Sequence, residues 1–160
     1  MDVDLMLPRK WTLRSNGNKV VFIKHANERT AHVVMKALLW ALYLPAYDDL
    51  GVEITIDDRY KPDVVALNLY GAPLFWGEAG QMSRSKLEDI ARRYRDTHFA
   101  LAKWGADLDA LVAWVRKSLR RTRHDAPFDI ISFPLDSAER FIDDRGFISI
   151  THADVDWVRI

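Results

Sequence analysis

The order in which helical and extended patterns follow one another is the feature that most constrains the fold of this chain. An Asn16-Gly17 pair between the extended residues 10–14 and 19–24 predicts an opening β hairpin. A helical pattern capped by Asn27 then runs to Leu44. The remaining predicted elements are extended runs at 52–57, 63–69 and 73–80, a helix starting at Ser83 or Ser85, a strand at 97–104, a helix at 108–119 capped by Asp107, a strand at 128–133, a short helix at 137–142 and an extended run at 147–151. Because helices alternate with strands, we expect an α/β fold with a mixed central sheet flanked by helices.

Length and charge limit the classes of function. The 160 residues correspond to a single domain, residues 1–160, and Lys plus Arg equals Asp plus Glu at 23, so there is no overall attraction to a polyanion. Charge is nevertheless segregated: residues 84–123 carry 11 basic and 5 acidic side chains, and residues 124–160 carry 3 and 8. The middle segment is therefore a candidate anion-binding region, although solvated helix faces with local ion pairs explain the pattern equally well. The role of the acidic C-terminal segment is not indicated.

Several classes of protein are excluded by what the sequence lacks. There is no cysteine, which rules out disulfide bonds, a thiol nucleophile and cysteine-based zinc sites. The first five residues are acidic rather than basic, and the longest apolar run, residues 33–44, is too short to span a membrane. No P-loop, G-x-G-x-x-G or G-x-S-x-G motif is present. We therefore expect a cytoplasmic protein without a membrane segment, whose oligomeric state the sequence does not reveal.

Asp63 and Glu78 form the strongest candidate for a functional pair. If the runs 63–69 and 73–80 form a hairpin centred between residues 70 and 71, positions 63 and 78 are directly opposed. The same alternation places five apolar residues on that face: Val65, Leu67, Leu69, Leu74 and Trp76. Opposed carboxylates about 5 Å apart repel each other, and a divalent cation would relieve the repulsion. Hard oxygen ligands suit Mg²⁺ or Mn²⁺ better than zinc.

Other interpretations of these residues remain open. Asp63 could simply cap its strand, Glu78 could pair with Lys86 or an arginine, and a one-residue slip would separate the two carboxylates. His25, Glu28 and His32 are spaced i, i+3 and i+7, which would suit a zinc triad on one helix face. His25 precedes the predicted helix, however, and His32 belongs to its narrow polar stripe with Arg29 and Lys36. The tryptophans at 40, 76, 104 and 114 are expected in the core.

The motifs around the two carboxylates resemble those of the PD-(D/E)XK nuclease-like superfamily, with Pro62-Asp63 followed fifteen residues later by Glu78 at the end of the next strand. More closely, the chain is similar to the YaeQ family. The similar segments are the opening hairpin, His25-Ala26-Asn27-Glu28-Arg29-Thr30, Tyr60-Lys61-Pro62-Asp63, Trp76-Gly77-Glu78-Ala79-Gly80 and the basic helix that follows. The resemblance extends from about residue 10 to residue 104. It implies a restriction-endonuclease-like core of a helix, a three-strand meander, a second helix and a fourth strand, preceded here by a β hairpin.

The resemblance also implies roles for individual residues. In nuclease members of the superfamily, carboxylates that match Asp63 and Glu78 bind Mg²⁺, and some members add a third carboxylate that matches Glu28. A lysine two residues after the second carboxylate helps to activate the attacking water. This chain departs from the pattern, because position 80 is glycine. Lys86 at the start of the next helix could reach back to take that place, and Gln81 is a second candidate.

Two functional hypotheses follow. The first is a metal-dependent phosphodiesterase that acts on DNA or RNA with Asp63, Glu78, Lys86 and Glu28 in its active site. Flanking phosphates would then be bound by basic residues of the middle segment, namely Arg84, Arg92, Arg93 and Lys103. The second is a catalytically degenerate nuclease fold that binds a protein or a nucleic acid without cutting it. The glycine at position 80 favours this second hypothesis.

Overall fold

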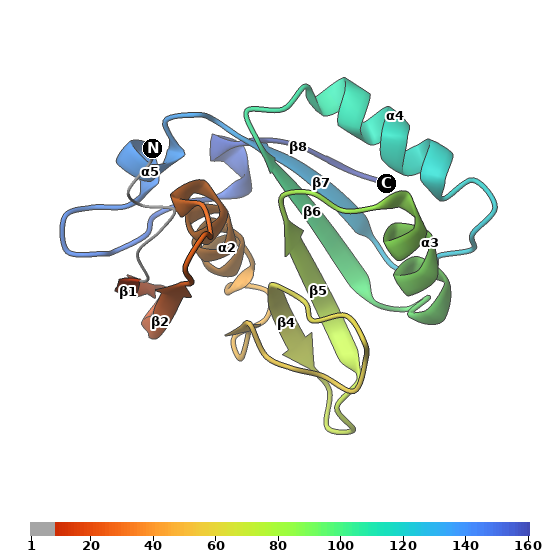
Figure 1. The fold of residues 1–160 in the computed structure, drawn as a ribbon, viewed down its shortest axis with the longest axis horizontal. Coiled ribbons are helices and arrows are strands. Elements are labelled where there is room, and N and C mark those ends of the chain that lie inside the picture. Colours follow the sequence, from red (N-terminus) through yellow and green to blue (C-terminus); the bar gives the residue numbers. More distant parts are fainter. Residues whose placement is uncertain (1–8) are drawn as a thin grey trace.

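A six-stranded mixed sheet forms the centre of the molecule (Figure 1). The computed structural model describes residues 9–160, so the acidic first five residues lie outside the described part. The strands lie side by side in chain order: β3 (Gly51–Val52), β4 (Val64–Leu67), β5 (Pro73–Ala79), β6 (His98–Trp104), β7 (Phe128–Phe133) and β8 (Asp156–Arg159). The inner strands β5, β6 and β7 are parallel, and the other neighbours are antiparallel. The expected mixed α/β architecture is therefore present.

Helices cover both faces of this sheet (Figure 1). Helix α2 (Thr30–Tyr43) packs on one face and is buried from Val33 to Tyr43. Helices α3 (Arg84–Arg93) and α4 (Leu108–Ser118) pack on the other face. Side chains alternate across β5, so that Phe75 joins the core under α2 while Trp76 joins the core under α3 and α4. The chain ends with helix α5 (Ser137–Phe141), the short 3₁₀ helix η1 (His152–Asp154) and strand β8.

The predicted opening hairpin is confirmed. Strands β1 (Arg9–Ser15) and β2 (Asn18–Lys24) pair in register around a two-residue turn, in which Asn16 has φ 50° and Gly17 has φ 78°. Positive φ at both positions is the reason that Asn-Gly is favoured in such turns. Leu13 and Phe22 bury one face of the hairpin in the core under α2. The hairpin thus packs beside α2 as a separate two-stranded sheet.

The predicted helix starts are confirmed for α3 and α4 but not for α2. Helix α2 begins at Thr30, not behind Asn27, because Asn27 has φ 66° and turns the chain before the helix. Helix α3 is capped by Ser83, whose hydroxyl accepts a hydrogen bond from the Lys86 N–H at 3.2 Å. Asp107 caps α4 as predicted. No helix among residues 9–160 is long and apolar enough to cross a membrane.

Two extended predictions were only partly confirmed. Of the run 52–57, only Val52 is in a strand, as the second residue of β3, because Glu53 has φ 53° and leads the chain away from the sheet. Strands β4 and β5 pair in the predicted register from Val64↔Gly77 to Ala66↔Phe75, which places position 63 opposite position 78, but the register shifts after Ala66. In the turn that follows, the Asn68 side chain accepts hydrogen bonds from two N–H groups. The apolar face therefore ends early: Leu69 is fully exposed and Leu74 is half exposed.

The C-terminal part of the sheet also differs from the prediction. Residues 147–151 form only isolated bridges, Arg14 with Phe147 and Ile142 with Ile148. The last strand is β8, which pairs with β7 and was not predicted. Of the four tryptophans predicted in the core, Trp40 and Trp76 are fully buried as expected, whereas Trp104 and Trp114 are only partly buried at the edges of the two cores.

Candidate functional site

Asp63 lies one residue before β4, against the end of β5. Its N–H donates to the carbonyl of Gly77 at 3.1 Å, and its Oδ2 accepts a hydrogen bond from the N–H of Ala79 at 2.8 Å. The carboxylate thus takes the place of a main-chain acceptor at the end of the β4–β5 ladder. Because its two partners flank Glu78, the Asp63 side chain is fixed beside that residue.

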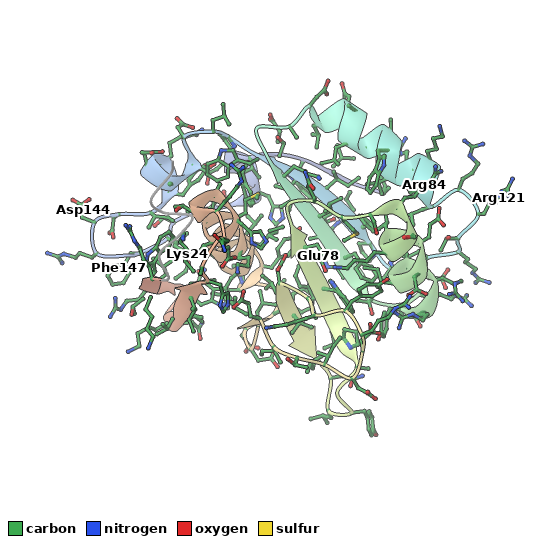
Figure 2. All side chains as sticks on the ribbon, viewed as in Figure 1. Lys24, Glu78, Arg84, Arg121, Asp144 and Phe147 are labelled. Atoms are coloured by element: carbon green, nitrogen blue, oxygen red, sulfur yellow. The ribbon has the colours of Figure 1, made fainter. Side chains whose placement is uncertain are left out.

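Glu78 is the buried member of the pair, 6% exposed, and lies on β5 near the centre of the molecule (Figure 2). Its Oε1 accepts a hydrogen bond from Trp76 Nε1 at 2.9 Å and lies 3.0 Å from Lys86 Nζ. Lys86 reaches it from the first turn of α3, with its ammonium 5.1 Å from the centre of the Tyr60 ring. The expected contact of Lys86 with Glu78 is present, and it equally fits the alternative in which Glu78 simply pairs with Lys86. The alternative residue, Gln81, is exposed.

The two carboxylates repel each other in spite of this lysine. Burial raises the pKa of Glu78, and the negative charge of Asp63 raises it further. Lys86 and the Trp76 N–H lower the pKa of Glu78, but their effect is smaller in sum. A second cation close to Asp63 and Glu78 would therefore be stabilised electrostatically.

Glu28 is connected to Asp63 through a histidine. Its Oε1 accepts a hydrogen bond from the N–H of His25 at 3.0 Å, and its Oε2 lies 2.7 Å from His32 Nδ1 and 2.7 Å from Lys36 Nζ. The other ring nitrogen of His32, Nε2, lies 3.7 Å from Asp63 Oδ2. Interaction with Asp63 raises the pKa of His32. Glu28 and Asp63 thus hold the two sides of one imidazole ring.

Lys36 extends this charged chain into the core. Its side chain is 1% exposed, and its ammonium bridges Glu28 and Glu53. Burial lowers the pKa of Lys36, but the two carboxylates raise it by more, so the side chain is charged at neutral pH. The expectation that Lys36 lies on a solvent-facing polar stripe of the helix was wrong, because the loop that carries Glu53 folds over this face of α2.

The donor atoms of Asp63 and Glu78 fit a hard divalent cation. Among the hydrogen bonds of the described residues, none involves Asp63 Oδ1 or Glu78 Oε2, so each carboxylate keeps one oxygen for a ligand. Carboxylate oxygens are the ligands that Mg²⁺ and Mn²⁺ prefer. Glu28 fits less well as a third ligand, because both of its oxygens are already engaged.

The zinc triad that the spacing of His25, Glu28 and His32 suggested does not form. In residues 9–160 the group with metal-ligand spacing is His25, Glu28 and Glu53, whose ligand atoms lie within 4.8 Å of one another. The ammonium of Lys36 already contacts both Glu28 and Glu53, and so offsets part of the negative charge that would attract a metal.

The basic residues expected to bind phosphates fall into two groups. Arg92 pairs with Asp89, and Arg93 pairs with Asp58 and Asp89, which ties the end of α3 to the loop before β4. Arg84 and Lys103 lie elsewhere, at the N-terminal end of α3 and the C-terminal end of β6. Arg84 pairs with the exposed Glu88 at 3.2 Å. Arg93 therefore links α3 to the loop before β4, whereas the partner of Arg92 lies on α3 itself.

Three residues of the site were not identified as a group from the sequence: His32, Lys36 and Glu53. His32 and Lys36 follow Glu28 by four and eight residues, which is the spacing of one helix face, so their proximity to Glu28 had a signal. Glu53 had none, because its position depends on how the loop after β3 packs against α2.

Comparisons with known proteins establish the fold. No protein-family model and no curated protein sequence matches the chain. The solved structure of a YaeQ protein from Pseudomonas syringae is 18% identical with a TM-score of 0.63, and the alignment covers 96% of this chain and 93% of that chain. A YaeQ protein from Xanthomonas axonopodis pv. citri is 19% identical with a TM-score of 0.56 and coverages of 83% and 76%. The similarity that the sequence motifs suggested is thus confirmed as a YaeQ-like fold over most of the chain.

Proposed function

We propose that this chain, which has the fold of YaeQ proteins, is a metal-dependent phosphodiesterase that acts on DNA or RNA. The observation that carries the proposal is the pair of Asp63 and Glu78 at the end of β5. Lys86 lies on one oxygen of Glu78, and one oxygen of each carboxylate has no donor among residues 9–160. In the same proposal, the core of the sheet and helices belongs to the PD-(D/E)XK nuclease-like superfamily.

A divalent cation on Asp63 and Glu78 would polarise a phosphoryl oxygen and lower the pKa of a bound water. The chain's own residues prepare that chemistry. The Ala79 N–H and His32 orient Asp63, and Glu28 orients His32 in turn. Lys86 places a positive charge beside Glu78, where it can stabilise negative charge that develops on the phosphate. In this scheme Glu28 and His32 are positioning residues, and Asp63, Glu78 and Lys86 are the catalytic ones.

The glycine at position 80 is compatible with this proposal. Gly80 has φ 91°, a conformation that side chains of L-amino acids rarely adopt, so the usual lysine of the motif would be strained here. Lys86 supplies an ammonium at the carboxylates from a different element. The second candidate function, a degenerate nuclease fold that binds without cutting, rests on the same absence of a lysine at position 80.

Metal binding is tested by thermal unfolding with a chelator and with Mn²⁺. A ligand that binds only the folded state adds about 2.7 kcal/mol at a hundred times its Kd, so the melting temperature of the parent should rise by several degrees. Asp63→Asn retains a hydrogen-bond acceptor for the Ala79 N–H and should leave the metal-free melting temperature nearly unchanged. It should show almost no shift with Mn²⁺, whereas the control Asp57→Asn, at an exposed acidic position, should shift like the parent.

Cleavage separates the two candidate functions. Lys86→Met removes the ammonium from Glu78 and should retain or strengthen Mn²⁺ binding while abolishing hydrolysis of labelled DNA and RNA oligonucleotides. Equal Mn²⁺ shifts in the parent and in Asp63→Asn, or no shift in the parent, would contradict the metal site. Metal binding by the parent without cleavage of either oligonucleotide would favour the binding protein.

A further inference from the structure

A large cavity begins at β6, the strand next to the one that carries Glu78. It has a volume of about 830 Å³ and lies between α4 and the residues that connect β5 to α3, with Met82, Ser83, Lys103 and Trp114 among its walls. Glu78 is in register with Leu101 on the parallel strand β6, and Lys103 follows Leu101 by two residues on the same face. The cavity therefore opens about two residues beyond the carboxylate site, toward the C-terminal end of the parallel strands.

A second cavity, of about 380 Å³, follows the first along α4. Its walls include Arg84, Lys117, Arg120 and Arg121. Ser83 and Arg84 are consecutive, and Lys117 follows Trp114 by one helical turn, so the two cavities lie end to end. Figure 2 shows Arg84 and Arg121 on the same side of the molecule, where α3 and α4 approach each other. We call the combined depression the α4 groove.

Among residues 9–160, four of the five cations that line the α4 groove lack a carboxylate partner, and the fifth, Arg84, pairs with Glu88. Within residues 9–160, no carboxylate oxygen lies within 4.0 Å of Lys103, Lys117, Arg120 or Arg121. Outside the groove, by contrast, Arg95 and Arg123 both pair with Asp125, at 3.0 and 3.1 Å. Neighbouring cations without counter-charges repel one another, and a polyanion would relieve that repulsion.

In the described part of the chain, two acidic residues also line the groove, against five cations. Asp107 lines the first cavity, but its Oδ1 accepts hydrogen bonds from the N–H groups of Asp109 and Ala110 at the start of α4. Glu88 lines the second cavity and is paired with Arg84. Burial without a partner lowers the pKa of Lys103, which is consistent with an ammonium that lacks a counter-ion.

The walls of the first cavity suit an unpaired base. Trp114 is partly buried against the core under α3 and α4, and it lines the cavity together with Met82. Proteins that bind single-stranded nucleic acid combine a basic groove with aromatic side chains on which bases stack. Pockets of about 300–1,000 Å³ accommodate small-molecule groups, a range that includes a single nucleotide.

We propose that the α4 groove binds single-stranded nucleic acid, with a base against Trp114 and phosphates on Arg84, Lys117, Arg120 and Arg121. Binding in the groove does not depend on the proposed function. Only the statement that the bound strand continues from the groove to Asp63 and Glu78 rests on it. That statement names the substrate class of the carboxylate site as an unpaired strand.

Binding is measured by fluorescence anisotropy with a labelled oligothymidylate of about 12 nucleotides, a length within the range that such grooves bind. The buffer contains EDTA, so that no cleavage occurs. The parent should bind the single strand at least tenfold more tightly than a duplex of the same length. Arg120→Gln combined with Arg121→Gln should weaken binding tenfold or more and reduce the slope of log K against log salt by about 1.4, which corresponds to two single-strand phosphate contacts.

The matched control is Arg95→Gln combined with Arg123→Gln, which removes the same charge from arginines that pair with Asp125. It should leave affinity and salt slope within twofold of the parent. Trp114→Leu should weaken binding roughly 5- to 150-fold, and Trp114→Phe should restore most of the affinity, since stacking on one base is worth about 1–3 kcal/mol. Melting curves of each variant confirm that it is folded.

Four outcomes would overturn the proposal: equal or tighter binding of the duplex, equal losses in the two arginine pairs, no loss in Trp114→Leu, or competition by poly-glutamate as effective as that by unlabelled oligonucleotide. The last would indicate an acidic protein partner. Asp63→Asn keeps the groove intact and should bind the oligonucleotide like the parent. If the parent binds the oligonucleotide but its melting temperature does not respond to Mn²⁺, the groove proposal stands and the metal site is rejected. If the parent cleaves the oligonucleotide and Arg120→Gln/Arg121→Gln binds it as tightly as the parent, the metal site stands and the groove proposal is rejected.

Discussion

Lys36 shows how strongly one buried charge depends on its partners. Its ammonium is desolvated by the core under α2 and is compensated by Glu28 and Glu53, which come from opposite ends of the helix region. Such an arrangement contributes little net stability compared with an apolar core, but removal of one member leaves the others uncompensated. The lysine therefore couples the position of Glu28, and through His32 that of Asp63, to the packing of α2.

We predict that Lys36→Met lowers the free energy of unfolding by about 2–4 kcal/mol, because Glu28 and Glu53 are then left close together without a cation. Urea unfolding measures the change. Lys61→Met is the control, because Lys61 is exposed, and it should change stability by no more than about 0.5 kcal/mol. A loss in Lys36→Met as small as that of the control would mean that the two carboxylates are protonated or separated in solution.

Asp129 is a second buried charge, at the start of β7 and away from the carboxylate pair. It accepts hydrogen bonds from Tyr43 Oη at 2.7 Å and from Arg159 Nε at 2.7 Å, and its Oδ2 lies 2.7 Å from His98 Nε2. Burial raises the pKa of Asp129, but the hydrogen bonds from His98, Arg159 and Tyr43 outweigh it and leave the pKa well below its usual range. The ionised carboxylate thus joins α2, β6, β7 and β8.

This lowered pKa predicts how stability depends on pH. In acid the unfolded state takes up a proton on Asp129 before the folded state does, so the contribution of Asp129 is present above the unfolded pKa of about 3.9 and is lost as the pH falls below it. Asp129→Asn should lower stability at pH 7 by about 2–4 kcal/mol and give a flatter decline between pH 5 and pH 3. Asp136→Asn, at a 64% exposed position, should retain the parent's decline. Parallel pH profiles of parent and Asp129→Asn would contradict this assignment.

At the residue scale, the sequence predicts the parts of the site that depend on local spacing. Asp63, Glu78 and Lys86 could be found because strand alternation and the first turn of a helix fix their directions. The connection of Glu28 to Asp63 could not, because it requires α2 to pack against the β4–β5 end of the sheet. Neither could the α4 groove, since it is formed by three elements whose mutual distances depend on the core.

Among the elements, the hairpin β1–β2 is the one specified most locally. The turn at Asn16-Gly17 sets the register, and residues 146–148 hold the hairpin through hydrogen bonds from the Arg14 N–H to the Gly146 carbonyl at 2.8 Å and from the Ile148 N–H to the Arg14 carbonyl at 2.7 Å. Gly17 and Gly146 both have positive φ, but a Cβ at Gly17 would meet nothing within 4 Å, whereas one at Gly146 would lie 2.6 Å from the Thr12 carbonyl oxygen.

This difference predicts two sizes of effect for the same substitution. Gly17→Ala should lower stability by about 1–2 kcal/mol, the backbone strain alone. Gly146→Ala adds a clash with backbone and should lower it by about 2–5 kcal/mol. Urea unfolding compares the two variants with the parent. Equal losses would show that the segment around Gly146 moves away from the hairpin at little cost.

The elements that sequence patterns misplace lie at the margins of the sheet. The inner strands β5, β6 and β7 are mostly apolar and buried, and were predicted within a residue or two, since parallel strands covered by helices need such runs. The edge strands β3 and β8 are short and partly exposed, and their strand conformation depends on pairing with β4 and β7. Their own sequences carry too little hydrophobic alternation to predict it.

At the scale of the whole molecule, one sheet separates two cores. The carboxylate pair lies where the end of β5 meets both α2 and α3, and the α4 groove continues from there over the second core. The same strands contribute side chains to both cores, because alternate residues of β5, β6 and β7 point to opposite faces of the sheet. Neither core can lose its sheet face without exposing the other.

The shared sheet predicts that residues 9–160 unfold in one cooperative transition. Leu38 is fully buried in the core under α2, and Ile90 is fully buried in the core under α3 and α4. Leu38→Ala and Ile90→Ala should each lower the free energy of unfolding by about 2–5 kcal/mol, and their effects should add in the double variant because the two sites lie on opposite sides of the sheet. Differential scanning calorimetry should show a single peak in every variant, with equal calorimetric and van't Hoff enthalpies. Two peaks, each displaced by only one of the substitutions, would mean that the cores unfold independently, and the carboxylate pair between them would then form the boundary between two units.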